Sequence, residues 1–215
     1  MPIENRFMHV FTEREAENFL EQRGFPTARR KYASTADEAV SAARIVGFPV
    51  VMKIASKNII HKSDVHGVKL NLMSESDVIH SFNELSRIHG FEGVLVQEFI
   101  EGTSMIVGLK EDSTFGHAIA FGLGGIYTEI LKDIAFRVCP ITLEDADSML
   151  NDLKSKKILE GARGLKPANM DYLKSLLVAV SKLPLHFKNI KELDINPLVV
   201  NDKKSYIVDA RIVFS

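Results

Sequence analysis

Residues 47–56, GFPVVMKIAS, carry the pattern that decides the fold. Residues 49–54 form a β-branched apolar run of strand length, which predicts a buried strand. The residues before it, 36–46 (ADEAVSAARIV), have helical spacing, and Gly47 ends the helix. A helix followed by a buried strand indicates an α/β lobe.

The alternation of helix and strand continues on both sides of this stretch. In the first half we expect helices at 12–22 and 76–88 and strands at 29–32, 68–73 and 93–99. After residue 102 we expect a hairpin of strands 103–112 and 115–125, a strand near 135–138, helices at 143–153 and 169–182, and a closing hairpin of strands 191–200 and 205–214. These elements predict an α/β (α+β) fold of two lobes, residues 1–98 and 99–215.

Composition limits the classes of function. The chain has 215 residues, of which 46% are hydrophobic and 26% charged, and its formal net charge is −1. This balance gives no field that would attract nucleic acid or an anionic membrane. The single cysteine, Cys139, cannot form an intramolecular disulfide, and neither a secretory signal nor an apolar run of the roughly 20 residues that span a bilayer is present. We expect a cytoplasmic protein with no nucleic-acid or membrane partner.

Lys53 is the first candidate for chemistry, because it stands inside the apolar strand predicted at 49–54. Its ammonium must either reach water at a strand edge or meet a buried anion, and a phosphate is a natural anion. The plain alternative is an edge-strand lysine whose charge extends into solvent. Lys53 alone does not distinguish a phosphate-binding site from an ordinary strand.

The polar loop at 56–68 is a second candidate. It combines lysines and hydroxyl groups with His61, His66 and Gly67, and backbone amides, hydroxyls and cations of this kind can surround phosphoryl oxygens. Histidine can also accept a phosphoryl group. A solvated connection between two strands is the plain alternative.

A glycine-rich segment begins at Gly122 and contains Gly124 and Gly125. Glycines allow close approach of the backbone to a ligand, although a tight turn explains them equally well. The charged residues that follow are Glu129, Lys132, Asp133 and Arg137.

The closing hairpin holds three hard oxygen donors, Asp194, Asn196 and Asp209. We expect Asp194 and Asp209 to face each other across the strand pair. Mg²⁺ prefers a few such ligands together with phosphate oxygens and waters, although an Asn-Pro step also suits the start of an ordinary strand. Together, the candidate features favour a cleft for a nucleotide and a metal.

Five ordered blocks resemble a known family. They are GFPVVMKIAS, IIHKSDVHGVKL, VLVQEFIEG, FGLGGIYTEILKDIAFRVCPIT, and ELDINPLVV with VDARI. In this order they resemble the ATP-grasp domain of the ADP-forming acyl-CoA synthetases of the acetate-CoA ligase type, which are related to succinyl-CoA synthetase. The resemblance runs from about Thr12 to the C-terminus and implies an ATP-grasp fold of two lobes with the nucleotide between them.

The resemblance implies a role for each matching residue. Lys53 would bind the α- and β-phosphates of ATP or ADP. The adenine hinge would consist of Gln97, Glu98, Phe99 and Ile100, with Glu98 beside adenine and Glu101 near the ribose hydroxyls. Asn196 and Asp209 match magnesium ligands, and Asp194 stands at the neighbouring acidic position. His61 matches a histidine proposed to receive phosphate in transit, and Gly124, Gly125, Glu129, Asp133 and Arg137 would lie close to the transferring phosphate.

Two residues depart from the family pattern. His66 stands where the family usually has glycine, which restricts the backbone of the loop, and Ser104 stands where a glutamate is common. Neither departure involves Asn196 and Asp209, the expected metal pair, so we expect the two departures to affect loop geometry more than nucleotide binding.

The resemblance also implies a reaction and a partner. Acyl-CoA, ADP and phosphate would interconvert with a small carboxylic acid, CoA and ATP through an acyl phosphate and a phosphohistidine. The chain has no strand followed by G-x-G-x-x-G that would hold the CoA pyrophosphate. We therefore expect a CoA-binding alpha subunit that carries the main phosphohistidine, in an α2β2-like heterotetramer.

Two other functions stay open at this point. The same fold could serve another ATP-grasp carboxylate ligase, or it could be a regulatory ATP-grasp module. The presence of both His61 and the metal pair argues against a purely regulatory role, because sensing needs no phosphoryl acceptor.

Overall fold

The computed structural model describes residues 8–56, 59, 62, 65–125, 133–161 and 166–215. The chain divides into two compact units: unit 1 consists of Met1–Thr27 and Glu101–Ser215, and unit 2 consists of Ala28–Ile100. The predicted boundary between residues 98 and 99 lies close to the second crossing. The prediction also placed the first 27 residues in the first lobe, and this was wrong.

The N-terminal residues belong to unit 1 because of contacts that are distant in sequence. Strand β1 (His9–Val10) pairs with β11 (Ala210–Phe214) near the C-terminus. Helix α1 (Glu13–Glu21) buries Ala16 and Leu20 in the same core as β11. Local sequence pattern cannot show such long-range pairing.

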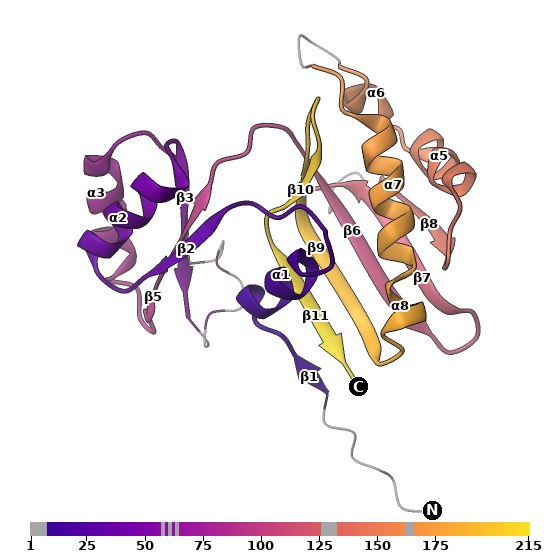
Figure 1. The fold of residues 1–215 in the computed structure, drawn as a ribbon, viewed down its shortest axis with the longest axis horizontal. Helices are drawn as coiled ribbons and strands as arrows, with labels where there is room; N and C mark the ends of the chain where they lie inside the picture. Colours follow the sequence, from indigo (N-terminus) through magenta and orange to yellow (C-terminus); the bar gives the residue numbers. More distant parts are fainter. Residues whose placement is uncertain (1–7, 57–58, 60–61, 63–64, 126–132, 162–165) are drawn as a thin grey trace, which may run out of the picture. The chain divides into compact units, whose positions relative to one another are not determined.

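Unit 2 is a four-stranded antiparallel sheet with two helices on one face (Figure 1). The strands in spatial order are β2 (Arg30–Ala33), β5 (Gly93–Glu98), β3 (Val50–Ala55) and β4 (Val68–Leu72). The helices are α2 (Ala36–Val46), capped by Thr35, and α3 (Glu75–Leu85), which begins with a capping box at Ser74. Met52 and Val96 pack beneath these helices, so alternate residues of β3 and β5 point to the opposite face.

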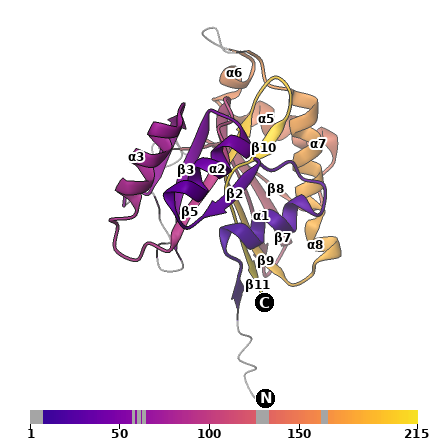
Figure 2. The same cartoon turned by 60° about the vertical axis from the view of Figure 1, so that its left-hand side comes forward.

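Unit 1 is built on a larger antiparallel sheet. The strand order is β1, β11, β9 (Ile190–Val200), β6 (Thr103–Asp112), β7 (Gly116–Leu123) and β8 (Ile134–Val138), and β10 (Ser205–Ile207) also pairs with β9. The remaining helices are α5 (Leu143–Asp152), α6 (Lys156–Leu159), α7 (Met170–Ser181) and α8 (Leu183–His186). Figures 1 and 2 show α1 and α7 on the same side of this sheet, and one hydrophobic core fills the space between.

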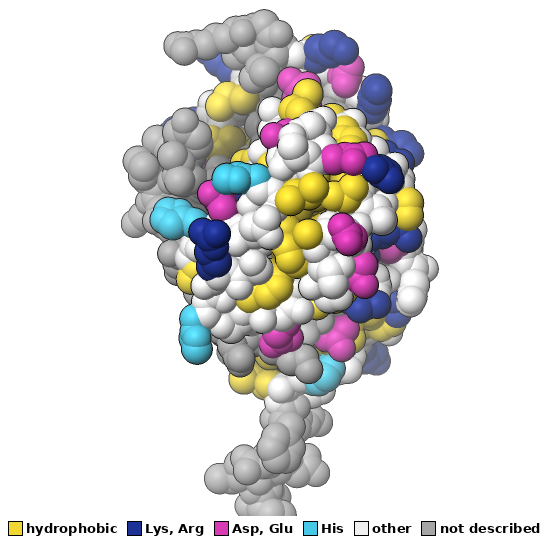
Figure 3. All heavy atoms as spheres, turned by 90° about the vertical axis from the view of Figure 1, so that its left-hand side faces the viewer, with side chains coloured by type: hydrophobic (Ala, Val, Ile, Leu, Met, Phe, Trp, Pro, Cys, Tyr) yellow, Lys and Arg dark blue, Asp and Glu magenta, His cyan; other side chains and the backbone are white. Residues whose placement is uncertain are grey.

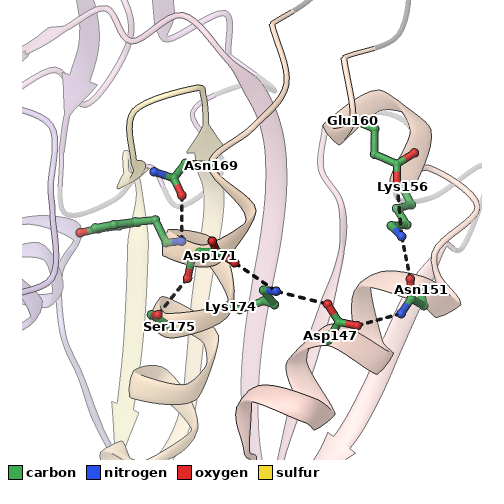
Figure 4. Close-up of polar contacts among 9 residues, drawn as sticks. Asp147, Asn151, Lys156, Glu160, Asn169, Asp171, Lys174 and Ser175 are labelled. Carbon is green, nitrogen blue, oxygen red and sulfur yellow. Dashed lines mark hydrogen bonds and ion pairs between the residues drawn. The ribbon is translucent and has the colours of Figure 1, made fainter.

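Polar contacts join the helices that cover this core (Figure 4). Lys174 of α7 forms ion pairs with Asp147 of α5 at 3.3 Å and with Asp171 at 3.2 Å. Asn151 donates to Asp147 and accepts from Lys156 of α6. The three helices are therefore linked on their outer surfaces as well as through the core.

The closing hairpin differs from the prediction at its centre. The strand expected at 205–214 is broken into β10 and β11, with Val208 and Asp209 between them. Pro197 on the opposite strand has no N–H to donate, although its carbonyl accepts from the Val208 amide at 3.1 Å. The regular hydrogen-bond ladder is interrupted at this point.

Unit 2 exposes large apolar side chains on its helical side. Ile45 of α2 is 64% exposed and Ile79 of α3 is 42% exposed, and Arg44 and Glu75 pair between the two helices at 2.6 Å. Figure 3 shows apolar side chains in a stripe between charged groups on the face that looks left in Figure 1. This surface belongs to the side of the sheet opposite Lys53.

In the part of the chain that the structure describes, every helix is too short or too polar to cross a lipid bilayer.

Candidate functional site

Asn196 and Asp209 lie opposite each other on the closing hairpin. The Asn196 amide donates to the Asp209 carbonyl at 3.1 Å, and the flanking pairs, Ile195 with Ala210 and Leu198 with Ile207, keep the same register. Ile195 and Ala210 are buried in the core, so strand alternation directs Asn196 and Asp209 to the sheet face that carries no helix. The hairpin thus presents an amide and a carboxylate oxygen together, a donor set that suits Mg²⁺.

Asp194 shares this face but does not pair with Asp209, contrary to the expectation from the sequence. It lies opposite Arg211 on β11 and opposite Gly108 on β6. Desolvation is the main cause that raises the pKa of Asp194; Glu192 also raises it, and Arg211 lowers it. The expectation was wrong because the register of the hairpin places Asp194 and Asp209 two pairs apart.

Lys53 is held inside unit 2. Its strand β3 lies between β5 and β4, and the residue is only 4% exposed. The alternative of an edge-strand lysine extending into solvent is therefore wrong. Lys53 and Gln97 both lie on the face opposite α2 and α3, since their neighbours Met52 and Val96 are packed beneath those helices.

The predicted adenine segment, residues 97–100, lies where the chain leaves unit 2. Gln97 and Glu98 end β5, and the crossing to unit 1 falls between Ile100 and Glu101. The Phe99 amide donates to the Pro49 carbonyl at 3.2 Å, so the segment is fixed to the loop before β3.

Glu98 has a partner within unit 2. Its carboxylate accepts from Arg29 Nε at 3.0 Å and from Arg29 Nη2 at 3.2 Å, and its amide donates to the Arg29 carbonyl. The hydrogen bond from Arg29 is the main reason that the pKa of Glu98 lies below its ordinary value. The two chain segments that enter and leave unit 2 are therefore joined at this point.

The Arg29–Glu98 pair predicts a pH-dependent contribution to stability. Because the pKa is lowered in the folded state, the pair stabilises above the unfolded pKa of about 4.3 and its contribution is lost as the pH falls through the lower folded value. Replacing Glu98 with glutamine should cost about 0.5 to 1 kcal/mol at pH 7, since the pair is largely exposed. Urea unfolding at pH 7 and pH 3 measures this, and an equal cost at both values would contradict it.

The glycine segment that follows β7 is described only as far as Gly125. The Gly124 amide donates to the Ser104 carbonyl at 2.9 Å, and a Cβ at Gly124 would come within 3.0 Å of that oxygen. Gly125 has a φ of +71° and open space around it, which suits a backbone turn that glycine adopts readily. Ser104 thus acts here through its backbone, and Glu129 lies outside the described residues.

Asp133 and Arg137 contact the helical layer of unit 1. Arg137 donates to Ser148 and pairs with Asp152 of α5 at 2.7 Å. The Asp133 carboxylate accepts from the Lys154 and Ser155 amides at 2.9 and 2.7 Å, directly before α6. Burial would raise the pKa of Asp133, but hydrogen bonds from Ser155 and Lys154 lower it. Both side chains are used in joining β8, and the residue directly before it, to the helical layer.

His61, the predicted phosphate acceptor, lies outside the described residues. Beside it, the Gly67 amide donates to the Lys62 carbonyl at 2.7 Å, and the Ile54 amide donates to the Gly67 carbonyl at 2.7 Å. These bonds attach the end of the loop to the strand that carries Lys53.

His66 occupies a backbone conformation that favours glycine, with a φ of +52°. A residue other than glycine in the left-handed conformation destabilises the fold by roughly 1 kcal/mol. A glycine at this position would remove that cost, but its greater flexibility in the unfolded chain would offset part of the gain in stability. We expect His66→Gly to raise the free energy of unfolding by up to about 1 kcal/mol. His66→Val should lower it by at least about 1 kcal/mol, because β-branched side chains fit this region poorly. Urea titrations compare both variants with the parent, and the reverse order would contradict the argument.

Asn201 is a residue that the sequence did not single out. Its side-chain amide donates to the Glu101 carbonyl at 3.2 Å, and its oxygen accepts from the Lys203 and Lys204 amides. It therefore attaches the beginning of the second segment of unit 1 to the hairpin that carries Asn196 and Asp209. The turn NDKK is an asparagine-turn signal, but the contact with Glu101 spans 100 positions and leaves no local pattern.

Comparison with known proteins places the chain in a family. An ATP-grasp domain model matches residues 4–214. The beta subunit of acetate-CoA ligase [ADP-forming] I of Pyrococcus furiosus is 42% identical over 209 residues, which are 94% of this chain and 90% of that protein. The acetate-CoA ligase [ADP-forming] I of Archaeoglobus fulgidus is 44% identical over 202 residues, which are 90% of this chain and 29% of that protein. The chain thus spans less than a third of that larger relative.

Two further similarities bear on the substrate and the chemistry. The 4-hydroxybutyrate-CoA ligase [ADP-forming] of Nitrosopumilus maritimus is 40% identical over 210 residues, which are 93% of this chain and 30% of that protein. A solved structure of acetyl-coenzyme A synthetase 1 of Ca. Korarchaeum cryptofilum has a TM-score of 0.84 and 38% identity, covering 96% of this chain and 93% of that one. That protein is in complex with coenzyme A and Mg-AMPPCP, with its phosphohistidine segment pointing towards the nucleotide-binding site. The chain therefore belongs to the ATP-grasp family, within the group formed by the beta subunits and equivalent domains of the ADP-forming acyl-CoA synthetases.

Proposed function

We propose that this chain is the nucleotide-binding part of an ADP-forming acyl-CoA synthetase. The enzyme interconverts acyl-CoA, ADP and phosphate with a carboxylic acid, CoA and ATP through a phosphohistidine. One observation carries the proposal: Asn196 and Asp209 lie opposite each other on an open sheet face, in a chain of this family.

Both units contain residues with a proposed role in nucleotide binding. Unit 1 contributes Asn196 and Asp209, whose oxygens suit Mg²⁺ bound to phosphates, with Asp194 beside them. Unit 2 contributes Lys53 as the cation for the α- and β-phosphates, and residues 97–100 as the adenine segment. Glu101, the first residue after the crossing to unit 1, is proposed for the ribose. When bound, Mg²⁺ neutralises phosphate charge and orients the transferring group.

The remaining predicted residues divide into two groups. Gly124 and Gly125 offer a close backbone approach to phosphate, and Glu129 and His61 stay predictions from the family resemblance. For Asp133 and Arg137 the structure supports a different role: their contacts with the helical layer hold the strand that follows the glycine segment.

The acid is proposed as a small carboxylic acid. Relatives of similar identity act on acetate and on 4-hydroxybutyrate, so family membership alone does not distinguish these acids. Acetate is the first acid to test, because the beta subunit that matches over almost its whole length belongs to an acetate-CoA ligase.

A CoA-binding alpha subunit is the proposed partner, in an α2β2 heterotetramer. The P. furiosus relative is a separate beta subunit, whereas the A. fulgidus relative is about three times longer than the matched region. Co-expression with a CoA-binding alpha subunit, followed by light scattering, tests the assembly. The complex should release ATP from acetyl-CoA, ADP and phosphate only when both chains are present.

Two outcomes would overturn the proposal. An isolated chain that forms acyl-CoA unaided would remove the need for the partner. A complex that joins acids to amines and ignores CoA would indicate another carboxylate ligase of the ATP-grasp family.

A further inference from the structure

The predicted adenine segment begins where the strand ladder of unit 2 stops. Strand β5 ends at Glu98, and the chain crosses to unit 1 between Ile100 and Glu101. The Phe99 amide donates to the Pro49 carbonyl at 3.2 Å, but Pro49 has no N–H with which to donate in return. The ladder therefore does not fix the backbone beyond Glu98, and a defined conformation there depends on other groups.

Arg29 holds the first end of this segment. Its Nε and Nη2 donate to the two carboxylate oxygens of Glu98 at 3.0 and 3.2 Å, and the Glu98 amide donates to the Arg29 carbonyl at 2.8 Å. Two parallel hydrogen bonds from one guanidinium fix direction as well as distance. Glu98 is thus held through its side chain and its main chain at the point where the ladder stops.

Asn201 holds the other end of the segment. Its Nδ2 donates to the Glu101 carbonyl at 3.2 Å. The next residue, Gly102, lies against the closing hairpin, because a Cβ there would come within 2.5 Å of the Val200 carbonyl oxygen. Only glycine fits so close to another backbone. The chain therefore leaves the segment along one path, which the hairpin defines.

We propose that Arg29 and Asn201 are positioning residues for the base of the nucleotide. They hold the main chain of residues 97–101 in the conformation that receives adenine, and they act without touching the ligand. The inference rests on the proposed function, in which this segment binds adenine. If the loss of one contact leaves the segment in its binding conformation for only about a tenth of the time, the apparent Kd for nucleotide rises about tenfold.

A second ion pair in unit 2 separates positioning from stability. The Arg29 and Glu98 side chains are 64% and 30% exposed, and exposed pairs of this kind contribute little to stability. Arg44 has the same two-point geometry, because its Nε and Nη2 donate to the Glu75 carboxylate at 2.6 and 2.8 Å. That pair joins α2 to α3 and not to the adenine segment. Arg44 is therefore a matched control for Arg29.

The test compares a ligand that contains a base with one that does not. Arg29→Lys keeps the charge but loses the two-point contact. Asn201→Asp keeps an oxygen that accepts from the turn amides but removes the N–H that binds the Glu101 carbonyl. Calorimetry of the full chain measures the Kd for MgATP and for magnesium tripolyphosphate. We expect the Kd for MgATP to rise about tenfold in each variant and the Kd for tripolyphosphate to stay within twofold of the parent.

Two control variants lose the same kinds of contact elsewhere. Arg44→Lys loses the two-point contact between α2 and α3. Asn169→Asp loses the N–H that donates to the Lys203 carbonyl and keeps an oxygen that accepts from the Tyr172 amide. Both controls should bind MgATP and tripolyphosphate with Kd values within twofold of the parent.

The outcomes distinguish the inference from the proposed function. An unchanged Kd for MgATP in folded Arg29→Lys and Asn201→Asp would overturn the inference. An equal rise for both ligands would also overturn it, because the two residues would then act on the fold as a whole. Urea unfolding shows whether each variant is folded, and Arg29→Gln, which also lacks the two-point contact, replaces a lysine variant that does not fold. A parent chain that binds neither ligand would instead overturn the proposed function.

Discussion

Replacing Asp209 with asparagine is expected to reduce ATP formation by the assembled enzyme at least about 10³-fold. Asparagine keeps the shape of the side chain but removes the charge that the proposed function assigns to Mg²⁺ binding, and a metal contributes several kcal/mol of charge stabilisation to phosphoryl transfer. Asn196→Ala removes the second oxygen donor and should have a similar effect. Initial rates with saturating acetyl-CoA, ADP and phosphate measure both losses.

The fold should survive these changes. The hydrogen bond between the two positions joins the Asn196 amide to the Asp209 carbonyl, and neither substitution removes a main-chain group. We expect the free energy of unfolding to stay within about 1 kcal/mol of the parent. Asp202→Asn is the matched control, because Asp202 is an exposed carboxylate in the turn of the same hairpin, paired only at the surface with Lys166. If Asp209→Asn turned over as fast as Asp202→Asn, Asn196 and Asp209 would be ruled out as the metal ligands.

Local signals in the sequence predicted most helices and strands. Capping residues fix the starts of five described helices, since each accepts a hydrogen bond from an amide three residues ahead; they are Thr12, Thr35, Ser74, Thr142 and Asn169. The position of Asn196 opposite Asp209 follows from the predicted hairpin, whose short turn brings the two strands together, and their role as magnesium ligands stays a prediction.

Features that depend on distant contacts were not predictable. Alternation on the short strand β8 does not show which of its faces meets the helices. In the structure the face that carries Arg137 contacts α5, and Phe136 on the other face is exposed. An exposed apolar residue next to a half-buried charged residue reverses the usual pattern. The reason is the ion pair with Asp152, which comes from a helix fifteen positions later.

The assignment of residues 1–27 failed for a similar reason. Their pairing partner, β11, lies at the other end of the chain, and no local signal records it. The register that separates Asp194 from Asp209 likewise depends on the pairing of whole strands and not on the residues themselves.

Replacing Lys53 with methionine should separate binding from stability. Methionine keeps the length of the side chain and removes a charge from a residue that is 4% exposed. In the proposed function this charge binds phosphate, and its loss should cost at least about 2 kcal/mol, so the Kd for MgATP should rise about 30-fold or more. Calorimetric titration of the isolated chain measures this, with Lys69→Met as the control. Lys69 lies on the neighbouring strand, but its ammonium pairs with Glu84 at 2.6 Å on the surface.

We expect the free energy of unfolding to change less than the free energy of MgATP binding. Removing a buried ammonium removes the cost of its desolvation, which offsets the loss of its contacts within the chain. If Lys53 served only packing, Lys53→Met would lower the free energy of unfolding by several kcal/mol and leave the Kd for MgATP unchanged. Lys53 is buried in the central part of a sheet at a cost that a nucleotide phosphate can offset; a variant that is as stable as the parent but binds MgATP weakly is the specific signature of that arrangement.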